Sequence, residues 1–177
     1  MTRPLLLLSL ALAASIARAE HTPDRNIDAA TWSQYQDQYQ QSPICTKDEI
    51  TLWTCETYHK QVFSLCSSRV ITRTSGYIQY RASHAGKLTF VYPKVKKPPF
   101  GLFTFDSYRN GNASMSFSNN GYQYSLNDPI LAESSISVSD PSSSKKDMEI
   151  ECSSGNQTLQ LNYTLRLLID SGLWSGD

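Results

Sequence analysis

Hydrophobic and polar residues alternate in short runs along most of this chain, and each run ends at a turn signal. The clearest runs in the first half are Ile50 to Thr57, Gln61 to Ser67, Tyr77 to Ala82 and Lys87 to Tyr92. A period of two residues is typical of β-strands that bury one face. The segments between these runs are short and polar, and the last of them, at 83–86, contains a glycine as hairpin loops often do. We therefore expect the first two runs to form a hairpin and the next two to extend it into an antiparallel sheet.

The second half of the chain continues the same pattern with five further runs. They are Gly101 to Tyr108, Ala113 to Ser118, Tyr122 to Leu126, Ser134 to Ser139 and Met148 to Cys152. The segment Asn119-Asn120-Gly121 contains an Asn-Gly pair, whose residues tolerate the positive φ angles of a tight hairpin turn. This turn predicts that the segment Met115–Phe117 pairs across to Tyr122–Tyr124.

The two ends of the chain have a longer apolar period. From Asp28 to Gln41, the aromatic residues Trp32, Tyr35 and Tyr39 lie on one face of a helix, and Pro43 follows its end. The tail from Thr158 to Leu173 fits either a helix or a strand, and its length favours the helix. The predicted fold class is mainly β, an antiparallel β-sandwich or small open barrel of about eight strands with a short helix at each end.

The first 19 residues have the features of a secretory signal peptide. A basic start, an apolar stretch and the small-residue motif Ala17-Arg18-Ala19 follow one another. The apolar stretch is shorter than the roughly 20 residues that a bilayer requires, so we expect cleavage rather than a retained anchor. The predicted organisation is a signal peptide at 1–19, an N-terminal arm with a helix at 20–43, and one disulfide-linked β domain at 44–177.

All four cysteines follow this leader, and their even number favours two disulfides in an oxidising compartment. Three pairings are possible. Cys55 and Cys66 lie on the two strands of the predicted hairpin, so we expect them to be linked to each other. Cys45 would then pair with Cys152 and tie the N-terminal arm to the last strand. No Cys-x-x-Cys motif or paired histidine favours zinc, and we predict no metal or other cofactor.

Charge and chemistry narrow the function classes further. Removal of Arg3 and Arg18 with the leader turns equal numbers of basic and acidic residues, 16 each, into an excess of two acids. The chain has no basic stripe that would bind nucleic acid. No later segment is long and apolar enough to span a membrane.

Candidate catalytic groups are few and scattered. His21 lies in the leader of the mature chain, and His59 and His84 lie in predicted turns, where His59 could pair with Glu56. Glu149 and Glu151 would share the solvent face of the last strand. No nucleophile elbow, Ser-x-x-Lys motif or phosphate-binding glycine loop occurs. We therefore predict that the protein is not an enzyme.

Aromatic residues and one stiff loop are more suggestive of binding. The predicted strands contain many tyrosines and phenylalanines, and we expect about half of these rings to lie on an outer face suited to recognition. The loop from Lys94 to Phe100 combines cationic Lys96 and Lys97 with two prolines and an aromatic residue. Because the prolines preorder this loop, it would lose less entropy on binding a partner.

Two resemblances bear on the function. The first rests on Cys66, Cys152 and three motifs, Trp53-x-Cys55-Glu56, Gly76-Tyr77-Ile78-Gln79-Tyr80-Arg81 and Phe117-Ser118-Asn119-Asn120-Gly121-Tyr122. In these residues the chain resembles an uncharacterised family of exported proteins of Gram-negative bacteria. That resemblance implies a periplasmic or secreted β-protein. The segment from Ser75 and Gly76 to Tyr80 is similar to the Ser-Gly-x-x-Tyr loop of the periplasmic inhibitors of c-type lysozyme, although it is one residue longer. This similarity implies an inhibitor.

Together these features predict an exported, non-enzymatic binding protein. Its partner would be another protein, a cell-wall hydrolase or toxin that it inhibits or neutralises. The predicted binding residues are Ser75, Gly76, Tyr77, Lys96, Lys97 and Phe100. The alternatives are an envelope hydrolase that uses Glu149 or His59, and a structural or small-ligand-binding protein with a dry apolar cavity. The sequence does not predict the oligomeric state.

Overall fold

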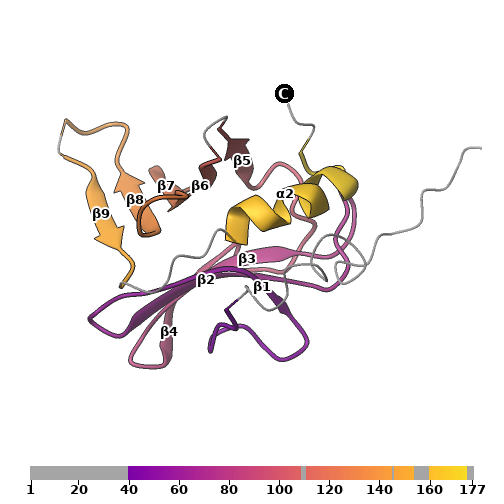
Figure 1. Ribbon diagram of the computed structural model, residues 1–177, viewed down its shortest axis with the longest axis horizontal. Coiled ribbons are helices and arrows are strands. Elements are labelled where there is room, and N and C mark those ends of the chain that lie inside the picture. The colour runs from indigo at the N-terminus through magenta and orange to yellow at the C-terminus, as the bar shows by residue number, and fades with distance from the viewer. Residues whose placement is uncertain (1–39, 109–110, 145, 154–159, 175–177) are drawn as a thin grey trace, which may run out of the picture.

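The polar and apolar alternation of the sequence produces two antiparallel sheets that pack face to face (Figure 1). The computed structural model describes residues 40–108, 111–144, 146–153 and 160–174. The four-stranded sheet consists of β1 (Ile50–Glu56), β2 (Gln61–Ser67), β3 (Ile78–His84) and β4 (Lys87–Tyr92). The five-stranded sheet consists of β5 (Thr104–Ser107), β6 (Ala113–Asn119), β7 (Tyr122–Asp128), β8 (Ser135–Ser139) and β9 (Met148–Glu151). The predicted antiparallel β-sandwich is confirmed, with nine strands in the described residues.

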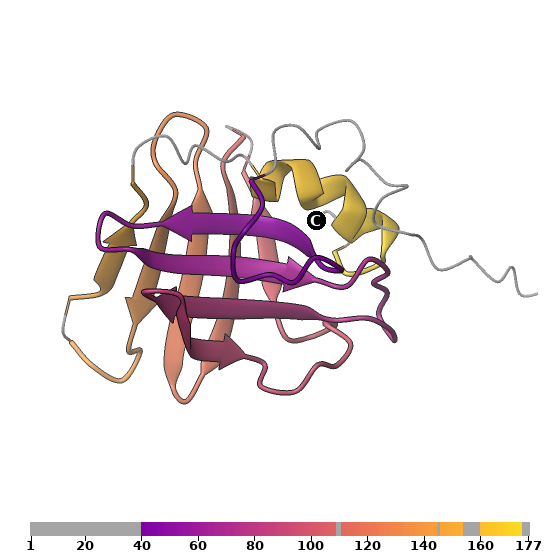
Figure 2. The same ribbon diagram turned by 90° about the horizontal axis from the view of Figure 1, so that it is seen from below.

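Both sheets are meanders, in which each strand pairs with the strand that precedes it in the chain. The turn between β6 and β7 has positive φ at Asn120 and Gly121 (51° and 84°), as the Asn-Gly pair predicts. The two strands pair as predicted and Phe117 lies opposite Tyr124, but Met115 lies opposite Leu126, beyond the predicted Tyr122–Tyr124, because Tyr122 pairs with Asn119 beside the turn. The strands of one sheet run across those of the other (Figure 2).

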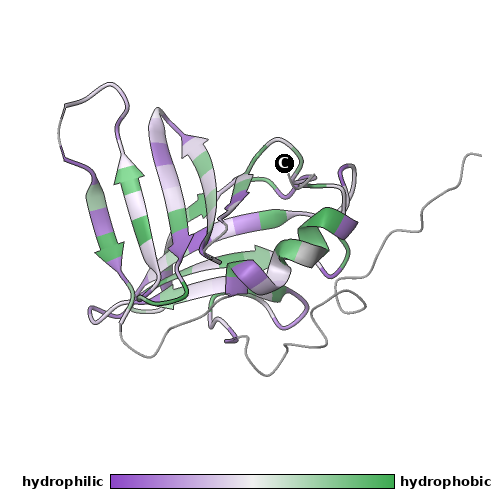
Figure 3. Cartoon of the chain, turned by 45° about the horizontal axis from the view of Figure 1, so that its top comes forward, coloured by the Kyte–Doolittle hydropathy of each residue, from purple (hydrophilic) through white to green (hydrophobic). Residues whose placement is uncertain are grey.

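The core lies between the sheets and is rich in stacked rings. The ring of Phe117 lies 4.4 Å from that of Tyr92, 4.8 Å from that of Tyr124 and 5.1 Å from that of Tyr80. Apolar and polar residues alternate along the strands in Figure 3, which agrees with one buried face per sheet.

The prediction of an outer aromatic face on the sheets is wrong. Eight phenylalanine and tyrosine rings in or beside the strands pack in or against the core, namely Phe63, Tyr80, Phe90, Tyr92, Phe103, Phe105, Phe117 and Tyr124. The cross-strand pairs Tyr80–Tyr92 and Phe117–Tyr124 lie on the inner faces of the two sheets, where large rings fill the space between crossing strands. Tyr122 at the start of β7 is half exposed, and Tyr77 lies just before β3.

The helix α2 (Gln160–Asp170) closes one end of the sandwich and contacts β1, β6 and β7. Buried Asp128 of β7 accepts a hydrogen bond from the amide of Leu161 (2.8 Å), which satisfies a free donor of the first turn of the helix. The side-chain oxygen of Gln160 accepts a hydrogen bond from the amide of Thr54 in β1 (2.8 Å). The predicted C-terminal helix is therefore confirmed. The predicted N-terminal helix at 28–41 lies almost entirely outside the described residues.

The predicted disulfide pairing is wrong, although both bonds exist. The structure links Cys45 to Cys66 and Cys55 to Cys152. In the β1–β2 register, Cys66 lies opposite Thr51 and Cys55 lies opposite Phe63. Cys55 therefore faces the core, where it reaches the second sheet, whereas Cys66 faces outward and meets the N-terminal arm.

The described part of the chain contains no helix of the length and apolarity that crossing a membrane requires. The predicted signal peptide at 1–19 lies outside the described residues. The two disulfides fit an oxidising compartment outside the cytoplasm.

The two disulfides close loops of different length, so their removal should have different costs. The Cys55–Cys152 bond spans 97 residues and the Cys45–Cys66 bond spans 21. In the chain-entropy model these bonds stabilise the fold by about 4.7 and about 3.3 kcal/mol. Alanine replacement of both cysteines in each pair, followed by denaturant unfolding, should therefore show the larger loss for Cys55 and Cys152. Equal losses, or the reverse order, would contradict this expectation.

Candidate functional site

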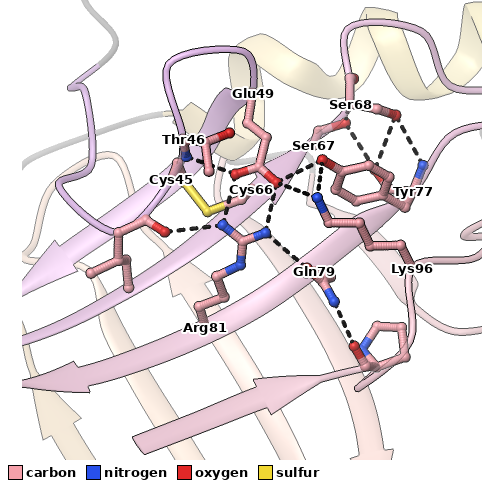
Figure 4. Close-up of polar contacts among 12 residues, drawn as sticks. Cys45, Thr46, Glu49, Cys66, Ser67, Ser68, Tyr77, Gln79, Arg81 and Lys96 are labelled. Carbon is pink, nitrogen blue, oxygen red and sulfur yellow. Dashed lines mark hydrogen bonds and ion pairs between the residues drawn. A yellow bond between two sulfur atoms is a disulfide. The ribbon is translucent and has the colours of Figure 1, made fainter. Parts of the chain in front are cut away.

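A buried carboxylate organises the outer face of the four-stranded sheet. Glu49 precedes β1, and its side chain is only 2% exposed. Its two oxygens accept hydrogen bonds from the guanidinium of Arg81 in β3, at 2.7 and 2.6 Å. The amide of Thr46 donates a further hydrogen bond to the same carboxylate at 2.8 Å. This is a bidentate ion pair, the strongest geometry for these two groups, and it is drawn in Figure 4.

Arg81 extends the network to the N-terminal arm and to the end of β4. Its guanidinium donates to the carbonyl of Ile44 (3.0 Å) and to the side-chain oxygen of Gln79 (2.8 Å). The amide nitrogen of Gln79 in turn donates to the carbonyl of Pro93 (2.9 Å). The buried pair therefore connects three segments that are far apart in the sequence.

Tyr77 and Lys96, two predicted binding residues, complete the network from the solvent side. The hydroxyl of Tyr77 donates to Glu49 at 2.6 Å. The ammonium of Lys96 donates to the Tyr77 hydroxyl at 2.8 Å and lies 4.2 Å from the centre of the tyrosine ring. The same ammonium contacts Glu49 at 3.3 Å. These contacts fasten the loop before β3 to the loop after β4.

The pKa values in the network indicate a structural role rather than acid–base chemistry near neutral pH. Burial raises the pKa of the Glu49 carboxyl, but the hydrogen bonds from Arg81, Tyr77 and the Thr46 amide outweigh it and lower the pKa to about 2. Burial and the hydrogen bond to Glu49 raise the pKa of Tyr77. The hydrogen bond to Tyr77 raises the pKa of Lys96. Each shift moves the group away from the pH range in which a general acid or base works.

Ser75 and Gly76 form the turn that places the Tyr77 side chain in this network. The amide of Thr72 donates to the carbonyl of Ser75 (3.1 Å), and the hydroxyls of these two residues also contact each other. Gly76 has a φ of +72°, and a β-carbon there would lie 2.1 Å from the carbonyl oxygen of Val70. Glycine is therefore required at this position for both its backbone angle and its size.

Phe100 and Lys97 lie further along the second loop. Phe100 is 48% exposed, and the guanidinium of Arg73 stacks 3.5 Å from the centre of its ring. Arg73 also donates to the carbonyl of Gly172 beyond α2 (3.3 Å). Lys97 and Val95 are exposed, Val95 by 72%. We call the exposed residues Arg73, Val95, Lys97 and Phe100 the loop surface.

The predicted site is thus brought together in part. Tyr77 and Lys96 contact each other directly. Phe100 contacts the loop before β3 through Arg73, and Ser75 forms part of the turn in that loop. Sequence reasoning missed Glu49, Arg81 and Arg73. Arg81 carried a usable signal, because a charged residue in the middle of an alternating strand requires a buried partner or an exposed face.

The other candidate residues do not assemble into a catalytic set. His59 is exposed in the β1–β2 turn, and Glu149 is exposed on β9 in the opposite sheet. Among the described residues, the one potential metal-ligand cluster consists of Cys45, Glu49 and Cys66. Its two sulfurs are bonded to each other, so they supply no thiolate for a metal.

No family model, curated protein or solved structure matches this chain.

The buried carboxylate predicts a distinctive loss of stability in acid. The pKa of Glu49 is about 2 in the folded chain against an ordinary value of 4.5. Its contribution, on the order of 3 kcal/mol, is complete above pH 4.5 and is lost as the pH falls through 2. Wild type should therefore lose more unfolding free energy over this range than Glu49→Gln. The matched control Glu151→Gln, at an exposed position of β9, should follow wild type. Parallel curves for wild type and Glu49→Gln would refute the role of this carboxylate.

The turn at Gly76 predicts a difference between two glycines. Gly76→Ala should cost about 2 kcal/mol or more, because the new methyl group would overlap the Val70 carbonyl. Gly86→Ala has a similar φ of +77° but open space around the new methyl group, so it should cost only about 1 kcal/mol. Urea unfolding of both variants measures the difference. Equal costs would show that the close contact at Gly76 is unimportant.

Proposed function

We propose that this protein is an exported, non-enzymatic binding protein whose loop surface binds and inhibits another protein, a cell-wall hydrolase or toxin. The observation that carries the proposal is the clamp of Lys96, Tyr77 and Glu49, which joins the two loops at hydrogen-bond distances of 2.6 to 2.8 Å. Arg73, Val95, Lys97 and Phe100 project from the loops that this clamp holds.

The clamp favours binding because it reduces the entropy that a partner must overcome. A loop that is already bound to a neighbouring loop and to a buried carboxylate loses less freedom when a partner binds it. The exposed residues combine an aromatic ring, an arginine and an aliphatic side chain, and aromatic residues and arginine are enriched where protein interfaces gain most of their binding energy. The loop surface therefore has the composition of a small protein-binding site.

The charge of the loop surface suggests the kind of partner. Its two charged residues, Arg73 and Lys97, are exposed, as is neighbouring Lys94, whereas the Glu49 carboxylate is buried beneath the loops. Glycoside hydrolases carry a pair of carboxylates in an open cleft, to which a cationic loop is complementary. The resemblance of Ser75 and Gly76 to the loop of lysozyme inhibitors supports the same class. Export is supported by the predicted signal peptide and by the two disulfides.

The structure changes which residues should be expected to touch the partner. The Tyr77 side chain is occupied by Glu49 and Lys96, and Gly76 is packed against Val70. These two residues are positioned to hold the loop rather than to contact the partner. Direct contact falls to Arg73, Lys97 and Phe100.

A small-ligand carrier is less well supported. The apolar cavity lined by Phe100 and Trp174 measures only about 20 Å³, whereas sites for small molecules usually enclose about 300 Å³ or more. The larger hollows, of about 330 and 590 Å³, lie along β5 and β4 and are not a cavity between the sheets.

Alanine replacements test the proposal against a panel of purified lysozymes and other cell-wall hydrolases. Lys97→Ala and Phe100→Ala should each weaken inhibition of the bound hydrolase about 5- to 50-fold, because central interface residues contribute about 1–2 kcal/mol or more. Activity titration and calorimetry measure this effect.

The unfolding free energy of both variants should stay within about 1 kcal/mol of wild type. Matched controls are Lys87→Ala and Tyr58→Ala, which replace an exposed lysine and an exposed tyrosine elsewhere. If no hydrolase of the panel binds saturably at micromolar concentration, or if the controls weaken inhibition equally, the proposed function is wrong.

A further inference from the structure

The four edge strands of the sandwich differ in how their free backbone groups are protected. Edge strands can pair with a strand of another protein unless charges, bulges, prolines or covering segments prevent it. The edge of β1 is covered by α2, whose Gln160 accepts the hydrogen bond of the Thr54 amide. The β4 edge has a register shift at Thr89 and is followed by Pro93. The β9 edge presents two exposed carboxylates, Glu149 and Glu151.

The remaining edge, β5 (Thr104–Ser107), is short and carries one exposed carboxylate, that of Asp106, but it contains neither a register shift nor a proline. It pairs with β6 without a register shift, from Thr104 opposite Ser116 to Ser107 opposite Ala113. Within the described part of the chain, no hydrogen bond joins the four β5 residues to any segment other than β6. In an antiparallel pair, alternate residues of an edge strand direct their N–H and C=O groups outward. The outer side of β5 therefore offers free backbone donors and acceptors.

A groove of about 330 Å³ runs beside this edge. It is lined by five consecutive residues, Phe103 to Ser107, and by Leu173 and Trp174 beyond α2. The ring of Trp174 packs edge-on against Phe105 at 5.3 Å. The groove thus follows the strand itself and is walled on its other side by the chain after the helix.

A small apolar cavity adjoins the groove, and Phe103, Phe105, Leu173 and Trp174 line both. The cavity measures about 20 Å³, close to the space that one water molecule needs. It is therefore large enough for the end of an aliphatic side chain but too small for an aromatic ring. Phe100, which also lines the cavity, carries the guanidinium of Arg73 on its ring.

From these observations we propose that β5 receives an extended peptide segment of the binding partner as an added strand. The segment pairs with the outward backbone groups of β5 and directs a terminal methyl group of a Leu or Val side chain into the cavity. An acidic residue of the segment faces Arg73, and a basic residue faces the exposed Asp106 in the groove. This mode of recognition takes affinity from main-chain hydrogen bonds and specificity from alternate side chains.

The inference deepens the proposed function, on which it rests, because the loop surface leads directly into β5. Phe100 belongs to both sites, and only three residues separate it from Thr104. A partner bound to the loop surface can therefore continue along the edge of the five-stranded sheet.

The experiment uses a defined library of heptapeptides as the probe. Each peptide has Asp at one end, Lys at the other and alternating threonine and aliphatic residues between them. The intact, oxidised protein is titrated with these peptides while amide hydrogen exchange is followed in β5. We expect saturable binding of peptides with Leu or Val at the cavity position, and slower exchange of outward β5 amides. Replacing that residue by Phe or Ser should weaken binding at least tenfold.

Two controls separate strand addition from other binding. Methylation of alternate peptide nitrogens keeps every side chain but removes the donors, so it should abolish binding. The variant Arg73→Glu should weaken binding at least tenfold, and a peptide with Lys in place of Asp should restore it. Lys87→Glu, a charge reversal at an exposed position of β4, should leave the affinity for the peptides unchanged.

The outcomes distinguish this inference from the proposed function. If no library peptide slows exchange in β5, or if the methylated peptides bind as well as the others, strand addition is wrong. If a hydrolase binds, its binding is weakened by Lys97→Ala and the exchange of β5 amides is unchanged, the proposed function stands and this inference is wrong. If peptides bind at β5 but no hydrolase binds the protein, the strand-addition site is supported and the proposed inhibitor function is wrong.

Discussion

Much of the outer face of the first sheet depends on one ion pair that is almost excluded from water. Removing two charges from water is costly, and the cost is recovered only when the geometry is good and the remaining hydrogen-bonding groups are satisfied. Glu49 and Arg81 meet both conditions, since the carboxylate also accepts from Thr46 and Tyr77 and the guanidinium also donates to Ile44 and Gln79. Loss of either partner would leave an uncompensated buried charge. The N-terminal arm, the turn before β3 and the loop after β4 therefore share one stabilising centre.

The Cys45–Cys66 disulfide lies beside that centre and acts on the same segment. It fixes the arm covalently to β2, close to the point where Glu49 enters the network (Figure 4). The arm is further bound by Ser42, whose hydroxyl contacts that of Ser64 and whose amide donates to Thr51. This covering of the outer face explains why Thr51, Ser64 and Arg81 are buried although they point away from the core. The arm thus serves as a partial third layer over the first sheet.

The strands could be predicted from the sequence, but the contacts between residues far apart in the chain could not. Alternation and turn residues place β2 and β4 with their observed bounds, because both signals are local. The disulfide pairing failed because it depends on which face each cysteine occupies, and the register shift between Thr51 and Trp53 helps to set those faces. The Glu49–Arg81 pair was not predicted because it joins residues 32 positions apart, which come together only in the folded sheet. Tyr77 and Lys96 were predicted as binding residues because aromatic and cationic residues are common in binding loops, but their contact with each other depends on the fold and could not be predicted.

The arrangement of the chain as two successive meanders has a consequence for how the protein forms. Every strand pairing is between neighbours in the sequence, so each sheet has low contact order and can assemble from local hairpins. The Cys55–Cys152 bond, in contrast, joins the two sheets across 97 residues. The native fold brings Cys55 and Cys152 together only when the two sheets are docked, whereas Cys45 and Cys66 meet once the segment before β1 lies on the first sheet. The order in which the two bonds form during oxidative refolding would therefore report the order in which the two layers of the sandwich come together.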